Sequence, residues 1–449
     1  MASIKQLAIR GTAWVVLTYG ISLVLRIGSN LILTRLLNPE MFGKVSLVWV
    51  FLGALVLFSD LGVAPSIIQS KRGDDPDFLN TAWTIQVIRG FVLWAGSFLV
   101  AWPVANFYGQ PELLLLLPFM GLFLLVDGFN PTKRITLNRQ LSMRHISTLE
   151  ISAQVISGIV LIIWAWLNPS IWAIASAGVI SAVITLILNI WSIPGPLNKF
   201  AWDQSAVREI LNFGKWIFAS SAMHFLATQT DRLVLGKLIS LSMFGIYNLA
   251  LGIAILPSTL IEKVGGTVIF PSLAKLIHLE RHELRAKILK NRGLVLAAIS
   301  VLLALLISTG DIIISIMYDE RYSQAGWMLS VLSLGIWPLA LTNTIGPVLL
   351  ALGQSQYSAF GKFLSFLFLI SGIPLGAHLA GDFGAVVAVP LSNIPIYVAN
   401  LYGLSKERLL CIGQDFRLTL VFLAILALFL AGRVISGVNF PTISLAPHS

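Results

Sequence analysis

The stretch LTRLLNPEMFG at residues 33–43 returns in altered form as LGKLISLSMFG at residues 235–245, and the two copies lie 202 residues apart. The same register aligns three further pairs of like residues: Trp14 with Trp216, Arg35 with Lys237, and Asp60 with Glu262. Leucine matches carry little weight in so apolar a chain, whereas tryptophan, charges and the shared Met-Phe-Gly are informative. The sequence therefore predicts two related halves, an organisation typical of transporters that bind their substrate between the repeats.

The composition is that of an integral membrane protein. Hydrophobic residues make up 57% of the 449 residues and charged residues only 11%. Apolar runs of about 20 residues match the ~30 Å hydrocarbon core of a bilayer. We predict an all-α membrane protein with about 12–13 transmembrane helices in two six-helix lobes. The expected spans are 12–33, 44–68, 82–105, 113–131, 147–167, 171–193, 212–231, 245–270, 292–316, 326–352, 357–379, 382–404 and, after both lobes, 416–436.

The repeat predicts how the lobes are organised. Six crossings separate equivalent points, so the lobes form a parallel repeat with its axis along the membrane normal. Residues 194–210 are expected to form a cytoplasmic connector, because Pro194-Gly195-Pro196 end the sixth helix and a polar run follows. We predict an N-terminal lobe at 1–197, a C-terminal lobe at 198–405, and an extra helix with a tail at 406–449. The first span lacks a convincing cleavage site and is expected to be retained.

Lysine and arginine predict the orientation in the membrane. Most of the 30 basic residues, Arg292 among them, fall in segments on the side of the N-terminus. The opposite side keeps only Arg35, Lys44, Arg232, Lys237, Arg321 and Arg433. The positive-inside rule therefore places the N-terminus in the cytoplasm. The net charge of +10 follows from basic loops that face anionic lipid, so membrane lipid and not nucleic acid is the expected partner.

One basic segment outside the spans has a pattern of its own. Residues 272–291 alternate apolar with basic side chains, which fits an amphipathic helix lying at the cytoplasmic interface. The alternative is a solvated extension of the eighth span.

No cofactor or metal is expected. The single cysteine, Cys411, excludes an intrachain disulfide and a cysteine-based metal cluster. His278 and His282 are four residues apart, but Glu280 stands at the wrong offset for an H-E-x-x-H motif and no third ligand is evident. The sequence has no P-loop either, so direct use of ATP is not expected.

Polar residues inside the predicted spans mark the candidate site. In the first span they recur every four residues and share one helix face: Thr18, Ser22, Arg26 and Asn30. The repeat register carries this stripe to Ser220, His224, Thr228 and Arg232. Arg26 lies roughly 21 Å along its helix, past the midplane, and an arginine at a helix centre costs about 2.5–3.5 kcal/mol on insertion scales. Both stripes are therefore expected to face a hydrated cavity.

Further charges lie inside the spans. Arg89 falls in the third span, and Lys263 falls in the eighth beside Glu262. Each base is either a buried ion-pair partner or interface anchor, or part of a cationic cavity that binds an anionic group. Asp60 and Glu262 are either counter-ions to these bases or proton carriers. The acids nearer the interface are expected to be anchors: Asp127, Glu150 and Asp311.

Several motifs resemble those of a known family. LTRLLNPEMFG at 33–43 resembles the "tRlLgpeeFG" signature of bacterial polysaccharide flippases, although Asn38 stands where glycine is frequent. Similar motifs are DLG at 60–62, IIQ at 67–69, LNRQLSMR at 137–144, TDRLVLGK at 230–237, FGIY at 244–247 and Pro257. Over about residues 1–405 the chain resembles the Wzx-type oligosaccharide flippases of the multidrug/oligosaccharidyl-lipid/polysaccharide (MOP) exporter superfamily. The matching signature residues are Arg35, Gly43, Asp231, Gly236, Gly245 and Tyr247.

The resemblance implies a fold and a function. The fold is a V-shaped pair of lobes around a central cationic cavity. Such proteins move undecaprenyl-diphosphate-linked sugar repeats from the inner to the outer leaflet of the bacterial inner membrane for polysaccharide biosynthesis, commonly with ion coupling. We predict that three bases bind the diphosphate and that three polar residues contact sugar: Arg26, Arg89 and Lys263 for the former, Asn30, His224 and Thr228 for the latter. A polymerase and a chain-length regulator are the implied partners.

Other functions fit the sequence less well. A multidrug exporter of the same superfamily would be expected to have acidic residues in its cavity, because many drugs are cations. The charged residues inside the predicted spans of this chain are mostly basic. A lipid II flippase also moves a diphosphate, so residue chemistry leaves it open. A membrane polymerase or glycosyltransferase usually needs catalytic residues in a sizeable outer loop, and the outer loops expected here are short. A scaffold would not need charged stripes in both halves. The expectation is a transporter and not an enzyme.

Overall fold

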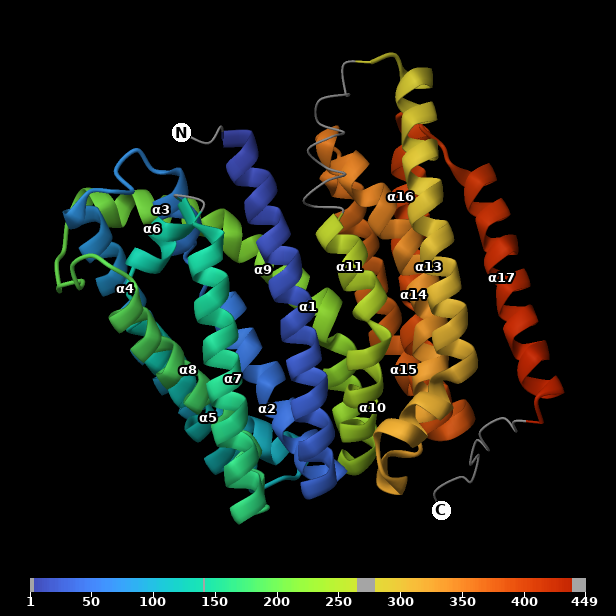
Figure 1. Cartoon of the computed structure of the whole chain (residues 1–449), viewed down its shortest axis with the longest axis horizontal. Helices are drawn as coiled ribbons and strands as arrows, with labels where there is room; N and C mark the ends of the chain where they lie inside the picture. Colours follow the sequence, from blue (N-terminus) through green and yellow to red (C-terminus); the bar gives the residue numbers. More distant parts are fainter. Residues whose placement is uncertain (1–3, 140–141, 265–278, 438–449) are drawn as a thin grey trace. The chain divides into compact units, whose positions relative to one another are not determined.

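The computed structural model of the chain describes residues 4–139, 142–264 and 279–437 (Figure 1). Within these residues all regular elements are helices, as predicted. The chain divides into two compact units, Met1–Phe225 (unit 1) and Leu226–Ser449 (unit 2), and one helix, α9, crosses the division. The lobe boundaries expected from the connector, 197/198 and 405/406, remain predictions.

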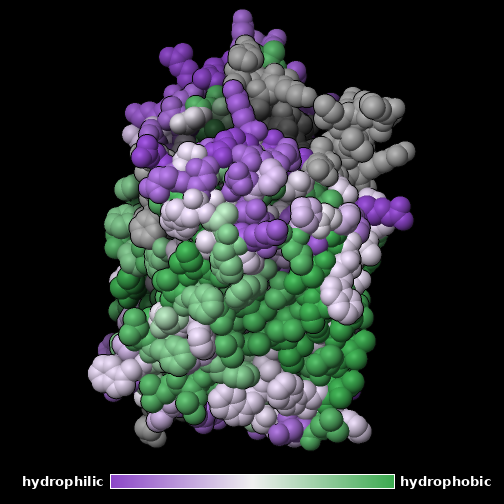
Figure 2. All heavy atoms as spheres, turned by 90° about the vertical axis from the view of Figure 1, so that its left-hand side faces the viewer, coloured by the Kyte–Doolittle hydropathy of each residue, from purple (hydrophilic) through white to green (hydrophobic). Residues whose placement is uncertain are grey.

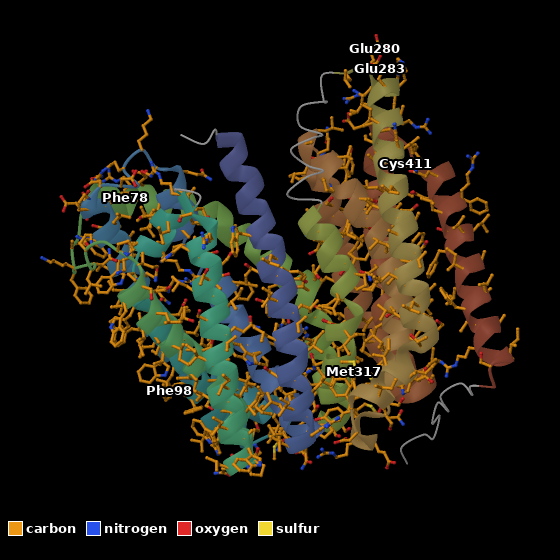
Figure 3. The ribbon with its side chains drawn as sticks, viewed as in Figure 1. Phe78, Phe98, Glu280, Glu283, Met317 and Cys411 are labelled. Atoms are coloured by element: carbon orange, nitrogen blue, oxygen red, sulfur yellow. The ribbon has the colours of Figure 1, made fainter. Side chains whose placement is uncertain are left out.

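The helices of unit 1 and the shared α9 follow the expected order. They are α1 (Ile4–Leu36), α2 (Pro39–Phe58), α3 (Val63–Gln69), α4 (Pro76–Tyr108), α5 (Leu113–Gly128), α6 (Lys133–Arg139), α7 (Met143–Leu167), α8 (Ile171–Ser192) and α9 (Gln204–Leu238). Helix α4 packs along α5, and α7 packs against both α1 and α8. Helix α4 passes from Phe78 near one end of the unit to Phe98 towards the other (Figure 3).

Unit 2 continues with a second series of helices. They are α10 (Leu241–Ala254), α11 (Leu256–Val264), α13 (Arg281–Met317), the short 3₁₀ helix η2 (Glu320–Tyr322), α14 (Ala325–Ala351), α15 (Ser355–Leu391), α16 (Asn393–Lys406) and α17 (Ile412–Ile435). Helix α13 packs against α14 and α17. The ring of Trp337 on α14 stacks on Phe422 of α17 with centroids 4.7 Å apart, so α17 shares the core of this unit.

The internal repeat is visible in the helix ends. Helices α1 and α9 end at Leu36 and Leu238, and α2 and α10 begin at Pro39 and Leu241, each pair 202 residues apart. The N-termini of α2 and α10, the second helices of the two copies, are stabilised in different ways. Proline supplies the first turn of α2, whereas the hydroxyl of Ser240 accepts a hydrogen bond from the backbone N–H of Met243 in α10.

Two predicted spans are broken, which corrects the expectation of continuous helices. The span expected at 44–68 ends as α2 at Phe58, and α3 starts at Val63. Between them Gly62 takes a left-handed conformation (φ 65°), and its N–H donates to the Asp60 carboxylate at 2.9 Å. The span expected at 245–270 divides at Ile255 into α10 and α11, and its residues 265–270 lie outside the described part.

Two other predicted boundaries hold. The break expected between spans 357–379 and 382–404 falls at Ala380 and Gly381 inside α15, where Gly381 has φ 56° and ψ −144°, a conformation that glycine adopts and other residues avoid. The extra span expected at 416–436 is present as α17.

Two further expectations are corrected. The connector expected at 194–210 ends earlier, because α9 begins at Gln204 and buries Val207 and Ile210 against α3 and α4. The basic segment expected at 272–291 does not form a separate helix in its described residues. From Arg281 it is the start of α13, in which Leu284 and Ile288 are buried. Residues 272–278 lie outside the described part.

Many of the helices are long and apolar enough to cross a membrane. Within the described ranges nine helices meet this test, or ten if α5 and α6, which meet at 64°, count as one bent span. Figure 2 shows a face on which hydrophobic residues form a broad band and hydrophilic residues gather at the upper end. Large apolar side chains such as Leu99 and Trp102 of α4 are exposed, as lipid contact requires. The chain is a multi-pass membrane protein.

Candidate functional site

The polar stripe of α1 is held in place by α7. The side-chain amide of Gln154 donates to the carbonyl oxygen of Ser22 at 3.0 Å, and the guanidinium of Arg144 lies over the Trp14 ring, 5.6 Å from its centroid. Farther along the stripe Arg26 is exposed and Asn30 is half-buried. Arg26 forms no hydrogen bond or ion pair with any residue that the structure describes.

Arg89 and Asp60 meet at the break between α2 and α3. The guanidinium of Arg89 on α4 donates to the hydroxyl of Ser59 at 3.0 Å and to the carbonyl oxygen of Val56 at 2.9 Å. These contacts cap the carbonyl end of α2, where a positive charge is favourable. Asp60 closes the turn through its bond to Gly62. The geometry thus gives Arg89 a structural use, and its predicted contact with diphosphate stays a prediction.

The second stripe, on α9, and its neighbours have partners of several kinds. Arg232 donates to the side-chain oxygen of Gln229 at 2.9 Å, and Thr228 is exposed. The amide of Asn343 on α14 donates to the carboxylate of Glu262 at 3.2 Å. The side chains of two predicted site residues, His224 and Lys263, lie outside the described part.

The signature residues form a structural contact between α9 and α10. The hydroxyl of Tyr247 donates to the carboxylate of Asp231 at 2.5 Å, and both side chains are buried. Gly236, Gly245 and, in the first copy, Gly43 are buried as well. The basic signature residue of the first copy, Arg35, is exposed. The Asp231–Tyr247 pair has no equivalent in the first copy, since the register places Ser29 and Val45 there.

Two ion pairs that the sequence reading missed join α13 to α17. At one end Arg292 pairs with Asp415, and both side chains are almost fully buried. The hydroxyl of Tyr397 also donates to Asp415, at 2.7 Å. At the other end Arg433 pairs with Asp311 on α13. Asp311 thus forms a contact between helices, and its role as an interface anchor stays a prediction.

These pairs show the surroundings of two basic residues. Arg292, expected in a cytoplasmic segment, and Arg433, expected in an outer one, are both buried between helices, and the side of the membrane on which each lies stays a prediction. A buried charge is costly without a partner. In each pair the acid lies on the neighbouring helix. Asp415 lies in the first turn of α17, next to Arg292, and Asp311 lies on α13, next to Arg433. A base in one predicted span and an acid at the same depth in the membrane in another span is the sequence signal that could have predicted these ion pairs.

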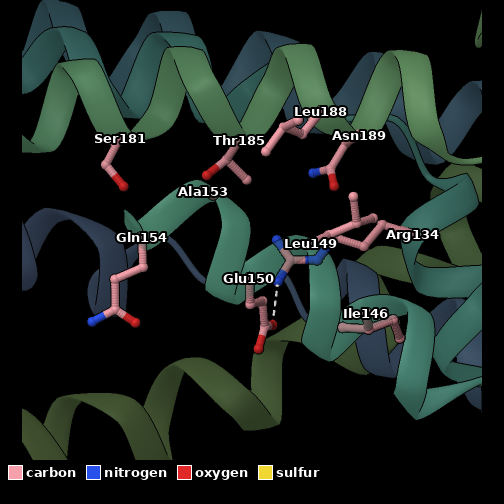
Figure 4. A pocket seen from close by; sticks show the side chains of 10 residues that line it. All are labelled: Arg134, Ile146, Leu149, Glu150, Ala153, Gln154, Ser181, Thr185, Leu188 and Asn189. Carbon is pink, nitrogen blue, oxygen red and sulfur yellow. Dashed lines mark hydrogen bonds and ion pairs between the residues drawn. The ribbon is translucent and has the colours of Figure 1, made fainter. Parts of the chain in front are cut away.

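A pocket in unit 1 was also missed. It has a volume of about 290 Å³ and lies between α6, α7 and α8 (Figure 4). Its lining combines six polar residues with four apolar ones: Arg134, Glu150, Gln154, Ser181, Thr185 and Asn189, with Ile146, Leu149, Ala153 and Leu188. Arg134 and Glu150 form an ion pair of 2.7 Å across it. Glu150, expected to be an interface anchor, lines this pocket and pairs with Arg134 of α6, and its anchor role stays a prediction.

The connector segment, residues 198–205, is bound along the first turns of α4. Its backbone N–H groups donate to side chains of that helix: Lys199 to Asn80 (3.0 Å), Ala201 to Thr84 (3.1 Å) and Asp203 to Thr81 (3.0 Å). Arg72 pairs with Asp203 at 2.7 Å and with Asp75 at 2.8 Å. The hydrogen bond from Arg72 lowers the pKa of Asp203 to about 2, and hydrogen bonds to both carboxylates raise the pKa of Arg72.

Comparison with solved structures identifies the class of the fold. The chain is similar to the lipid II flippase MurJ in its inward closed conformation, with a TM-score of 0.70, 16% identity, and coverage of 96% of this chain and 94% of that one. It is also similar to an inward-facing multidrug resistance MATE transporter of the MOP superfamily, with a TM-score of 0.66, 14% identity, and coverage of 86% and 94%. The fold is therefore that of MOP transporters.

Sequence comparison identifies the family. The family model described as polysaccharide biosynthesis protein matches residues 32–327, and the chain belongs to this family. It is 25% identical to the lipopolysaccharide biosynthesis protein WzxC of Escherichia coli, over 92% of this chain and 84% of WzxC. It is 26% identical to the teichuronic acid biosynthesis protein TuaB of Bacillus subtilis (85% and 79%) and 21% identical to the succinoglycan biosynthesis transport protein ExoT of Rhizobium meliloti (77% and 69%). The predicted resemblance is confirmed.

Proposed function

We propose that the protein flips undecaprenyl-diphosphate-linked oligosaccharide repeats from the cytoplasmic to the outer leaflet of the bacterial inner membrane. It acts as a transporter and not as an enzyme, and it works by alternating access with ion coupling. The repeats that it delivers are used to synthesise an O-antigen, capsule or exopolysaccharide. The observation that carries this proposal is the exposed Arg26 on the polar stripe of a membrane-length helix, in a chain of the polysaccharide biosynthesis family.

The chemistry of such a substrate explains the need for that stripe. A glycan headgroup cannot shed its water in hydrocarbon, because each unsatisfied polar group costs several kcal/mol, roughly 2–7. Polar side chains along α1 replace part of that water. A guanidinium matches a diphosphate through charge-assisted hydrogen bonds, so Arg26 is the base that we assign first to the diphosphate, followed by Arg89 and Lys263. Asn30, His224 and Thr228 are assigned to sugar, and Asp60 and Glu262 to ion coupling or charge compensation.

Orientation and partners belong to the same proposal. The distribution of lysine and arginine supports a cytoplasmic N-terminus. A lipid-linked repeat delivered to the outer leaflet has to be polymerised there, so a polymerase and a chain-length regulator are the expected protein partners.

The test is deletion of the gene, followed by mass spectrometry of lipid-linked intermediates in each leaflet. We expect complete, unpolymerised repeats to accumulate on the cytoplasmic leaflet. Accumulation on the outer leaflet would instead indicate a polymerase. Accumulation of lipid II would indicate a lipid II flippase, and unchanged polysaccharide with increased drug sensitivity would indicate a drug exporter.

A further inference from the structure

The pocket of unit 1 is built from two ladders of polar side chains. On α7 the ladder is Glu150 and Gln154, and on α8 it is Ser181, Thr185 and Asn189, with successive members four positions apart. This spacing keeps each ladder on one helix face. In Figure 4 Ser181 and Thr185 point from α8 toward α7, and the residues of both ladders line the same pocket. Polar side chains inside membrane helices usually line a site or a water-filled cavity.

Part of this lining is already fixed by the protein. The amide nitrogen of Asn189 donates to the side-chain oxygen of Asn130 at 2.8 Å, and Asn130 in turn donates to Asp127 at 2.8 Å. The amide nitrogen of Gln154 is held by Ser22. These bonds orient the two amides, because each uses its nitrogen and leaves its oxygen available. Such fixed orientation is what a binding site requires.

Other groups in the pocket have no protein partner. The hydroxyls of Ser181 and Thr185 and the amide oxygens of Gln154 and Asn189 form no hydrogen bond within the described part of the chain. The lining therefore offers two hydroxyls, which donate or accept, and two amide oxygens, which accept. A ligand rich in hydroxyl groups would satisfy all four.

The charge of the pocket selects among the parts of a lipid-linked oligosaccharide. Arg134 and Glu150 compensate each other at 2.7 Å, so the site has no net charge. The carboxylate of Glu150 would repel a diphosphate placed here, whereas it would not repel a neutral sugar. The apolar side chains of Ile146, Leu149 and Leu188 suit the C–H face of a sugar ring. The volume of about 290 Å³ is at the small end of ligand sites, which hold roughly 300–1,000 Å³, so it suits a single ring and not a whole repeat.

We propose that the pocket between α7 and α8 is a subsite for one neutral sugar of the headgroup, separate from the residues that bind the diphosphate. This inference rests on the proposed function. Its specific claim is that Ser181, Thr185, Gln154 and Asn189 bind sugar hydroxyls within unit 1, and so contribute to the choice of oligosaccharide.

The single native cysteine allows a direct test. Cys411 is buried, so a Cys411→Ser chain provides a background without reactive thiols. Thr185→Cys in this background places a thiol in the pocket, and Ile163→Cys places one on the exposed apolar face of α7 as a control. The purified full-length protein in nanodiscs is labelled with a water-soluble maleimide. The probes are the lipid-linked oligosaccharide extracted from the deletion strain and bare undecaprenyl diphosphate.

We expect Thr185→Cys to be labelled and Ile163→Cys to resist labelling, and the oligosaccharide lipid but not the bare diphosphate lipid to slow the reaction. Equal protection by both lipids would overturn the sugar subsite. A second measurement uses Ser181→Ala combined with Thr185→Val, which keeps the shape of the pocket. Loss of two hydrogen bonds to neutral groups should weaken binding of the oligosaccharide lipid about tenfold and leave binding of the bare lipid unchanged.

The outcomes separate this inference from the proposed function. If the deletion strain accumulates no lipid-linked oligosaccharide, the proposed function fails and the subsite fails with it. If the oligosaccharide accumulates and binds the protein, but neither protects Thr185→Cys nor responds to the double substitution, the subsite alone is wrong. Size-exclusion chromatography of each variant establishes that a weakened response reflects binding and not unfolding.

Discussion

In unit 2 the two arginines buried between helices have acidic partners, whereas in unit 1 two arginines of the membrane helices, Arg26 and Arg89, form no ion pair with any described residue. Arg292 and Arg433 are matched by Asp415 and Asp311. The hydrogen bonds of Arg89 go to neutral oxygens, and Arg26 has no partner among the described residues. Two units that share a helix register therefore use their charges differently. In unit 2 the buried pairs hold helices together, and in the proposed function Arg26 and the pocket of unit 1 bind the ligand.

The largest effect should follow from breaking the pair at the start of α17. Asp415→Ala leaves the guanidinium of Arg292 buried without a carboxylate, and loss of one member of a buried pair costs roughly 3–5 kcal/mol. Chemical unfolding in mixed micelles measures this loss. Combining Arg292→Met with Asp415→Leu should recover most of it, because a well-packed apolar pair carries no unpaired charge. Equal stability of the wild type and Asp415→Ala would refute the role assigned to this pair.

A smaller loss is expected at the signature pair of unit 2. Tyr247→Phe removes the hydroxyl that donates to the buried carboxylate of Asp231. Hydrogen bonds to charged groups contribute about 1.5–3 kcal/mol, and the same unfolding experiment would measure this loss. Tyr402→Phe is the matched control, since Tyr402 is exposed. If both variants unfold alike, the signature tyrosine does not stabilise the contact between α9 and α10.

The connector segment gives a pH prediction. Arg72 lowers the pKa of Asp203 to about 2, compared with an ordinary value of about 3.9 for aspartate. The stabilisation from this shift is present above the ordinary value and is lost as the pH falls through about 2. Hydrogen exchange of the backbone amides of residues 198–205, corrected for the intrinsic rate, should therefore be unchanged between pH 7 and pH 5. Asp203→Asn should speed exchange at both pH values, and protection that already falls at pH 5 in the wild type would contradict this account.

The smallest effect on stability is expected in the pocket of unit 1. Ser181→Ala combined with Thr185→Val removes hydroxyls that have no partner in the described part of the chain, so the free energy of unfolding should change by less than about 0.5 kcal/mol. A loss as large as that of Asp415→Ala would show that unit 1, like unit 2, uses these polar groups to hold its helices together. The comparison between the units would then fail.

Local patterns were sufficient to predict much of the fold. Apolar runs and the residues that interrupt them lie within single spans, so the sequence predicted the break at Ala380 and Gly381 and the extra helix α17. The repeat register predicted helix ends such as Leu36 and Leu238. The turn at Asp60 and Gly62 was missed, because the apolar residues on both sides continue the run through it.

The missed features depend on which helices are neighbours. Arg292 follows the basic first turns of α13, and only the proximity of α17 shows that its charge meets Asp415. The pocket depends on α6, α7 and α8 being neighbours, so that polar residues of all three line one space. Each ladder is weak by itself in the sequence, since serine and threonine are common in membrane helices. The predicted stripe on α1 was easier to recognise, because Arg26 is costly in a membrane and stands out alone.

The central claim is that Arg26 serves the substrate and not the fold. Its most direct test is the leaflet distribution of lipid-linked oligosaccharide in a strain carrying Arg26→Ala, with Arg417→Ala as an exposed control and the thermal stability of each purified variant measured in parallel. We predict that Arg26→Ala is as abundant and as stable as the wild type, yet leaves the oligosaccharide on the cytoplasmic leaflet. Normal delivery to the outer leaflet by Arg26→Ala would contradict the account.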